Sequence, residues 1–79
     1  MTTDVLDTAV SRVVARFARA VPPYAGEAHL YRDLGIESVQ VLHLLFALES
    51  ELGVSLDDRR FIASSTLGDL TRLVGEARS

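Results

Sequence analysis

The chain has 79 residues with a hydrophobic content of 48%, enough for one hydrophobic core but not for two, so we expect a single domain over residues 1–79. It contains no cysteine, which excludes disulfides and any thiol nucleophile of its own. The net charge is −3, and the acidic side chains are concentrated in residues 33–58, which carry six of them and no Lys or Arg. This negative segment disfavours binding of nucleic acid. It is either a contact surface for a basic protein partner or an acidic surface that is simply exposed to solvent.

Signals for membranes and secretion are absent from the sequence. No segment approaches the roughly 20 apolar residues that a membrane span needs, and the N-terminus lacks the basic and then apolar layout of a secretory signal. Met1 indicates that the chain begins at a start codon. We therefore expect a discrete, cytoplasmic protein that does not associate with membranes.

The first predicted element is an amphipathic helix from Thr3 to about Ala20, because apolar residues recur there at helical spacing. These residues are Leu6, Val10, Val13, Val14, Phe17 and Val21. Arg16 and Arg19 fall near the C-terminal end of this helix, where the helix dipole favours cations. Pro22-Pro23 ends the helix, since a proline has no N–H group to continue the hydrogen bonds.

Residues 21–36 form a long connection that is punctuated by prolines and glycines. A loop of this length is unusual inside a compact domain and is often functional. We expect its apolar residues to pack it against the core: Leu30, Tyr31, Leu34 and Ile36.

A second helix is predicted from about Ser38 to Leu52, ending before Gly53. One arc of it is a core face, formed by Val41, Leu44, Leu45, Leu48 and Leu52. Beside that face lies a second apolar stripe, formed by Val39, Leu42 and Phe46. Either the long loop folds over this stripe, or part of it stays exposed as a docking seam for partner proteins, with Phe46 the best candidate for exposure.

Two further helices complete the prediction. Asp57 or Asp58 can cap a short helix through Phe61 and Ile62, and Ser65 or Thr66 can cap a last helix. The apolar residues of that last helix are Leu67, Leu70, Leu73, Val74 and Ala77. Because no segment alternates with a period of two, the predicted fold is all-α: a small bundle of three main helices plus one short helix, with a long loop between the first and second helices.

Ser38 lies at the junction of the long loop and the second helix, where its oxygen is suited to cap the helix. A nucleophilic serine needs a base, and the chain offers only His29 and His43. His43 lies about 140° around the helix from Ser38. The chain also lacks the G-x-S-x-G turn of serine hydrolases, so an enzyme that acts through Ser38 is disfavoured.

Three segments in order resemble the acyl carrier proteins and the related peptidyl carrier domains. Residues 33–39 read D-L-G-I-E-S-V, similar to the family signature D-L-G-x-D-S-L. Residues 48–54 read L-E-S-E-L-G-V, similar to the L-E-x-E-F-G-V/I that ends the family's second helix. Residues 66–70 read T-L-G-D-L, similar to the T-V-x-D-L that opens its last helix. The predicted order of helices is also that of the family.

The resemblance implies a non-catalytic carrier, with no metal site. In the family, a phosphopantetheinyl transferase attaches 4′-phosphopantetheine from coenzyme A to the serine, here Ser38, and an acyl or aminoacyl group is then held on the arm as a thioester. Glu37 stands where the family usually has Asp, which assists the magnesium-dependent transfer; in this chain it can also simply complement the helix dipole. The residues expected to be recognised by the transferase and other partners are Asp33, Glu37, Val39, Leu42, Phe46 and Glu49.

The departures from the family pattern suggest a pathway. Gln40 and His43 occupy places where fatty-acid carriers expose acids, and Val39 stands where Leu is usual. We therefore expect a monomeric carrier for polyketide, nonribosomal peptide or other secondary metabolism, served by an acyl- or aminoacyl-loading enzyme and downstream synthase enzymes. The alternative is a small helical protein-interaction module that is never modified. A helix-turn-helix DNA-binding protein would need a basic recognition helix, which residues 33–58 do not provide.

Overall fold

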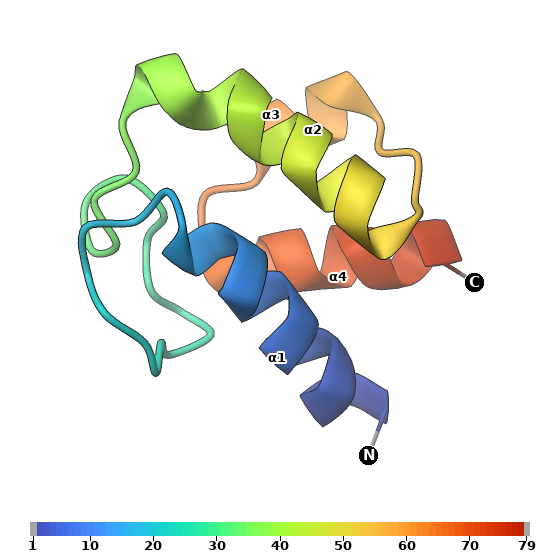
Figure 1. The fold of residues 1–79 in the computed structure, drawn as a ribbon, viewed down its shortest axis with the longest axis horizontal. Helices are drawn as coiled ribbons and strands as arrows, with labels where there is room; N and C mark the ends of the chain where they lie inside the picture. Colours follow the sequence, from blue (N-terminus) through green and yellow to red (C-terminus); the bar gives the residue numbers. More distant parts are fainter. Residues whose placement is uncertain (1, 79) are drawn as a thin grey trace.

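The computed structural model describes the backbone of residues 2–78 and the side chains of residues 8–78. Its elements are α1 (Thr2–Ala15), a 3-10 turn η1 (Ser38–Gln40), α2 (Val41–Leu52), the short α3 (Asp58–Ala63) and α4 (Leu67–Arg78). Figure 1 shows the long loop between α1 and η1 at one end of the bundle. The predicted all-α architecture, with three longer helices and one short helix, is confirmed. None of the helices in this described part has the length and apolar character that crossing a membrane requires.

The first helix ends earlier than the sequence predicts, at Ala15 instead of near Ala20. The N–H groups of Arg19 and Ala20 donate to the carbonyl oxygen of Leu34, at 2.8 and 3.1 Å, so the loop replaces the helical acceptors there. Arg16 and Arg19 consequently lie beyond α1, and Val21, predicted on its core face, is 81% exposed. The side chain of Leu6 lies outside the described residues.

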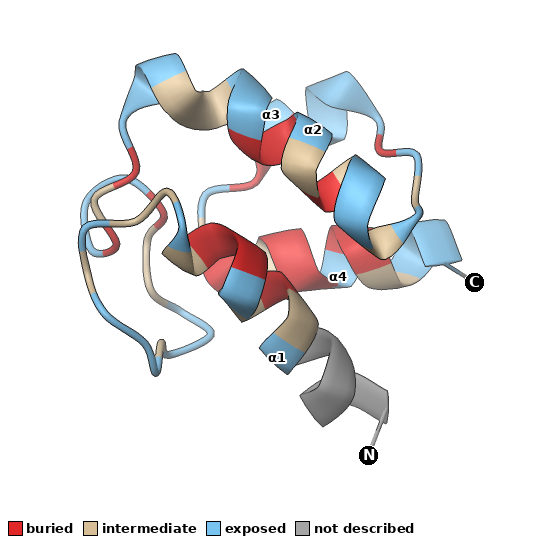
Figure 2. Cartoon of the chain, viewed as in Figure 1, coloured by how far each residue is buried: buried red, intermediate tan, exposed pale blue. Residues whose placement is uncertain are grey.

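The core lies where α1 meets α2 and α4, and α3 packs against α4. Figure 2 shows that the buried residues of the helices face one another across this space. The loop adds Leu30, Leu34 and Ile36, as predicted, whereas Tyr31 is 36% exposed and its predicted core position is wrong. The buried apolar residues of the helices are Val10, Val13, Val14, Leu44, Leu45, Leu48, Phe61, Leu67, Leu70, Leu73 and Val74.

The long loop is joined to the start of α4 by backbone hydrogen bonds. Leu30 N–H donates to the Ser65 carbonyl (2.8 Å), Leu67 N–H to the Ala28 carbonyl (3.0 Å) and Gly68 N–H to the Gly26 carbonyl (2.7 Å). Each bond satisfies a backbone group that would otherwise lack a partner at a helix end or in a loop. Because these residues are held at α4, they do not cover the outer stripe of α2.

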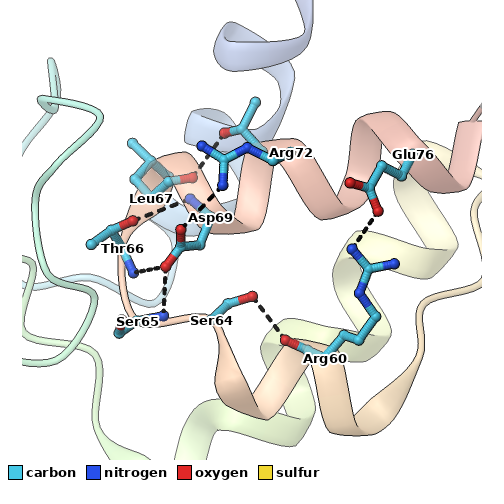
Figure 3. Close-up of polar contacts among 9 residues, drawn as sticks. Arg60, Ser64, Ser65, Thr66, Leu67, Asp69, Arg72 and Glu76 are labelled. Atoms are coloured by element: carbon cyan, nitrogen blue, oxygen red, sulfur yellow. Dashed lines mark hydrogen bonds and ion pairs between the residues drawn. The ribbon is translucent and has the colours of Figure 1, made fainter.

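The caps of α3 and α4 follow the local sequence. Asp57 caps α3, its side chain accepting the N–H of Arg60 at 3.0 Å. The Thr66 hydroxyl accepts the N–H of Asp69 at 3.1 Å, while the Asp69 carboxylate accepts the N–H groups of Ser65 (3.3 Å) and Thr66 (3.4 Å), as Figure 3 shows. The pKa of Asp69 is lowered, mainly by the Ser65 N–H, with help from Thr66 and Arg72 and against partial desolvation. This reciprocal arrangement starts α4 at Leu67.

Candidate functional site

Ser38 is exposed and is the first residue of η1. Glu37, which precedes it, is extended, and the Ser38 carbonyl accepts the N–H of Val41 to continue the chain into α2. Among the described residues, the Ser38 hydroxyl has no hydrogen-bond partner, so its prediction as a helix cap is wrong. The 3-10 turn places Ser38 inside the first turn, and the residues in the capping positions are Glu37 and Gln40, neither of which caps through its side chain.

Arg19 contacts the segment that leads to Ser38 through its backbone N–H, its aliphatic stem and its guanidinium. Its N–H donates to the Leu34 carbonyl at 2.8 Å. Its stem lies against Gly35, where a Cβ atom would come within 3.0 Å of the Arg19 Cβ. Its guanidinium pairs with Glu37, with 3.0 Å between Nη2 and Oε2. The short α1 makes these contacts possible, because Arg19 has left the helix.

The outer stripe of α2 is exposed throughout. Val39 is 76% exposed, Leu42 57% and Phe46 59%. The predicted exposure of Phe46 is therefore confirmed, and the alternative in which the loop covers this stripe is wrong. Ile62, on the neighbouring short helix, is a further exposed hydrophobic residue at 64%. Ser38 and this stripe thus occupy the same helical segment, η1 followed by α2.

The predicted acidic residues differ in their surroundings. The Asp33 carboxylate accepts the N–H of His29 at 2.8 Å and so stabilises the turn in the long loop. The half-buried Glu49 accepts the N–H of Leu56 at 2.9 Å and so fixes the segment between α2 and α3. Only Glu37 is next to Ser38. Contact of these acids with partner proteins stays a prediction, whereas two of them also have a structural role.

The two histidines are engaged locally and not with Ser38. His29 Nδ1 accepts the N–H groups of Tyr31 and Arg32, each at 3.2 Å. His43 Nδ1 lies 3.2 Å from Gln40 Oε1. Within the part of the chain that the structure describes, no three His, Asp or Glu side chains are grouped as metal ligands would be.

Sequence reasoning missed Arg19 as part of the site. The pattern of apolar residues extends the first helix past it, so it reads as a cation at a helix end. Only the hydrogen bonds to Leu34, which is distant in the sequence, reveal that the chain turns back there.

The sequence of the chain is similar to that of known proteins. A family model described as "Phosphopantetheine attachment site" matches residues 8–74. An acyl carrier protein of Thermotoga maritima is 40% identical over 48 residues, which is 61% of this chain and 59% of the relative. A candidate acyl carrier protein of Caulobacter vibrioides is 30% identical over 53 residues, covering 67% and 62%. The chain therefore matches about three fifths of the length of these relatives.

The fold has a counterpart among solved structures. A candidate acyl carrier protein from Mycobacterium tuberculosis superposes with a TM-score of 0.81 over 90% of this chain and 96% of that one, at 24% identity. This likeness concerns the fold. Together with the family match over residues 8–74, it completes the assignment: the chain belongs to the acyl carrier protein family, whose covalent cofactor is 4′-phosphopantetheine.

Proposed function

We propose that the chain is a non-catalytic carrier that bears 4′-phosphopantetheine on the hydroxyl of Ser38. The observation behind this proposal is that Ser38 is exposed, at the start of η1, with a hydroxyl that makes no hydrogen bond to the described residues. A modifying enzyme needs such access, so the residues present fit the group. Once attached, the arm supplies the thiol that a chain without cysteine lacks, and this thiol carries an acyl or aminoacyl group as a thioester.

The residues around Ser38 present it to other proteins. The 3-10 turn lifts the serine away from the core, and the positive end of the helical segment favours the negative phosphodiester. No base is bonded to the hydroxyl within residues 8–78, which is in keeping with modification by a separate transferase.

The exposed stripe of α2 is the proposed docking surface for the phosphopantetheinyl transferase and the acyl-handling enzymes. Its three side chains are Val39, Leu42 and Phe46. Glu37, which precedes Ser38 and pairs with Arg19, adds a carboxylate to the proposed contacts. Glu49 and Asp33 complete the proposed contacts, although each already accepts a backbone N–H of its own chain. A mainly apolar surface favours partners in secondary metabolism, such as a polyketide or nonribosomal peptide synthase. Genes for such enzymes beside this one would support that assignment.

Intact-mass analysis after incubation with coenzyme A, Mg²⁺ and a broad-specificity phosphopantetheinyl transferase tests the attachment. We expect a gain of one phosphopantetheine in the wild-type chain and none in Ser38→Ala. Ser50→Ala is the matched control, because Ser50 is also an exposed serine of the same helical segment, and it should be loaded normally.

The alternative function, an unmodified interaction module, is favoured by the same exposed stripe, since an apolar surface suits any helical partner. Failure of several transferases to load the folded wild-type chain would favour this alternative. Loading that persists in Ser38→Ala would contradict the proposed attachment residue.

A further inference from the structure

A cleft of about 290 Å³ opens beside Ser38. Its lining residues come from the segment after α1 and from the approach to α2: Arg16, Phe17, Arg19, Gly35, Glu37 and Gln40. Glu37 directly precedes Ser38 and Gln40 follows two residues after it, so the cleft lies beside the attachment segment, although Ser38 itself is not among the lining residues. It exists because α1 stops at Ala15 and the following residues turn toward Leu34.

The lining of this cleft combines one aromatic side chain with charged and polar groups. The half-buried Phe17 provides the apolar part, Gly35 contributes backbone atoms, Gln40 provides an amide and Glu37 a carboxylate. Arg19 pairs with Glu37 through Nη2, which leaves the remaining N–H groups of its guanidinium for another anion. Arg16 is paired with Glu51, which is not among the lining residues of the cleft.

Attachment of phosphopantetheine to Ser38 would change the charge beside the Arg19–Glu37 pair. Arg19 and Glu37 form a neutral pair before modification, and a phosphodiester on Ser38 adds a second negative charge next to Glu37. Like charges this close repel each other, whereas a guanidinium can bind both anions at once. Without Arg19, the carboxylate and the phosphodiester would be left as neighbours.

We propose, building on attachment at Ser38, that this cleft is the binding site for the first part of the phosphopantetheine arm. Arg19 faces the phosphodiester, and the pantetheine chain lies over Phe17 and Gly35 with Gln40 as a hydrogen-bond partner. The arm of the resting carrier therefore lies on the α1 side of Ser38, away from the exposed stripe of α2, which stays free for partner proteins.

Phosphorus NMR of the loaded chain tests the role of Arg19. We expect Arg19→Gln to move the phosphodiester resonance toward its position in the denatured loaded chain. Arg72→Gln is the matched control: Arg72 is similarly exposed and paired with an acid, but lies on α4 outside the cleft. Identical resonances in the wild type and both variants would overturn the proposal. Intact mass is measured first, and a chain that gains no phosphopantetheine refutes attachment rather than the cleft.

Thermal unfolding gives a second readout. We compare the Tm of the loaded chain with the Tm of the unloaded chain. At low salt, this difference should be about 2–4 °C more negative, or less positive, in Arg19→Gln than in the wild type. Near 1 M NaCl the two chains should show the same difference, because salt screens the charges. An equal change in both chains would contradict the role of Arg19. Proton NOEs from the pantetheine methyl groups should reach the Phe17 ring; NOEs only to Val39, Leu42 and Phe46 would place the arm on α2 and overturn the proposal.

Discussion

Gly35 determines how closely the segment before Ser38 approaches Arg19. It has a φ of +74°, and an added Cβ would meet the Arg19 Cβ at 3.0 Å. Gly53, at the end of α2, has a similar φ of +66° but nothing within 4 Å of an added Cβ. A side chain is therefore strained at both positions and crowded only at the first.

We predict that Gly35→Ala lowers the free energy of unfolding by about 2–3 kcal/mol and Gly53→Ala by about 1 kcal/mol. Urea denaturation of the two unloaded variants measures the difference. Equal losses would mean that the contact with Arg19 gives way without cost.

Asp69 couples the start of α4 to pH. Its lowered pKa, due mainly to the Ser65 N–H, means that the unfolded chain takes up a proton at a higher pH than the folded chain does. This contribution to stability is complete above the ordinary pKa of aspartate and is lost as the pH falls through the folded pKa.

We expect the stability of the wild type to fall as the pH drops below the ordinary pKa of aspartate, and Asp69→Asn to reduce the steepness of that fall. Thermal unfolding at several pH values checks this. Asp58→Asn, which changes an exposed carboxylate in the first turn of α3, is the control. A profile for Asp69→Asn as steep as that of the wild type would contradict the assigned role.

The two faces of α2 should respond differently to truncation. Leu48 is fully buried, whereas Phe46 is 59% exposed. We predict that Leu48→Ala costs about 2–5 kcal/mol of unfolding free energy, because it leaves a cavity in the core, and that Phe46→Ala costs less than about 0.5 kcal/mol. Chemical denaturation measures both. A large loss in Phe46→Ala would show that the outer stripe supports the fold.

Elements with strong local signals were predictable from the sequence. The sequence offered Asp57 or Asp58 as the cap of α3 and Ser65 or Thr66 as the cap of α4, and the structure selects Asp57 and Thr66. The two stripes of α2 follow from helical spacing alone. The end of α1 was not predictable, because it depends on the Leu34 carbonyl, which the sequence places in a different segment.

The candidate site was also predictable only in part. The position of Ser38 between loop and helix follows from its motif, but its backbone conformation does not: the 3-10 turn makes it an inner residue instead of a cap. The pairs Arg19–Glu37 and Glu49–Leu56 join residues that no local pattern connects, so only the folded chain reveals them.

Two ion pairs join residues that are far apart in the sequence. Arg16 pairs with Glu51, and Arg60 pairs with Glu76, as Figure 3 shows for the second pair. All four side chains are about half exposed, so solvent screens these pairs. The fold therefore depends on its apolar core, in which Leu70 is fully buried.

We predict that Glu51→Gln and Glu76→Gln each change the unfolding free energy by less than about 1 kcal/mol, and that Leu70→Ala lowers it by about 2–5 kcal/mol. The total for a chain of this size is about 4–12 kcal/mol, so the Leu70 variant loses a large share of it. Equilibrium denaturation compares the three. If either glutamate variant lost as much unfolding free energy as Leu70→Ala, the ion pairs would be a main source of stability, contrary to this prediction.

The backbone bonds from residues 26–30 to residues 65–68 have a consequence for chimeric carriers. Anyone who transplants the loop around the serine from one carrier into another also needs to transplant the first turn of the last helix, because the two segments complete each other's hydrogen bonds. A graft limited to the loop would leave these backbone hydrogen bonds poorly matched. The resulting shift of the loop would also displace the serine that follows it.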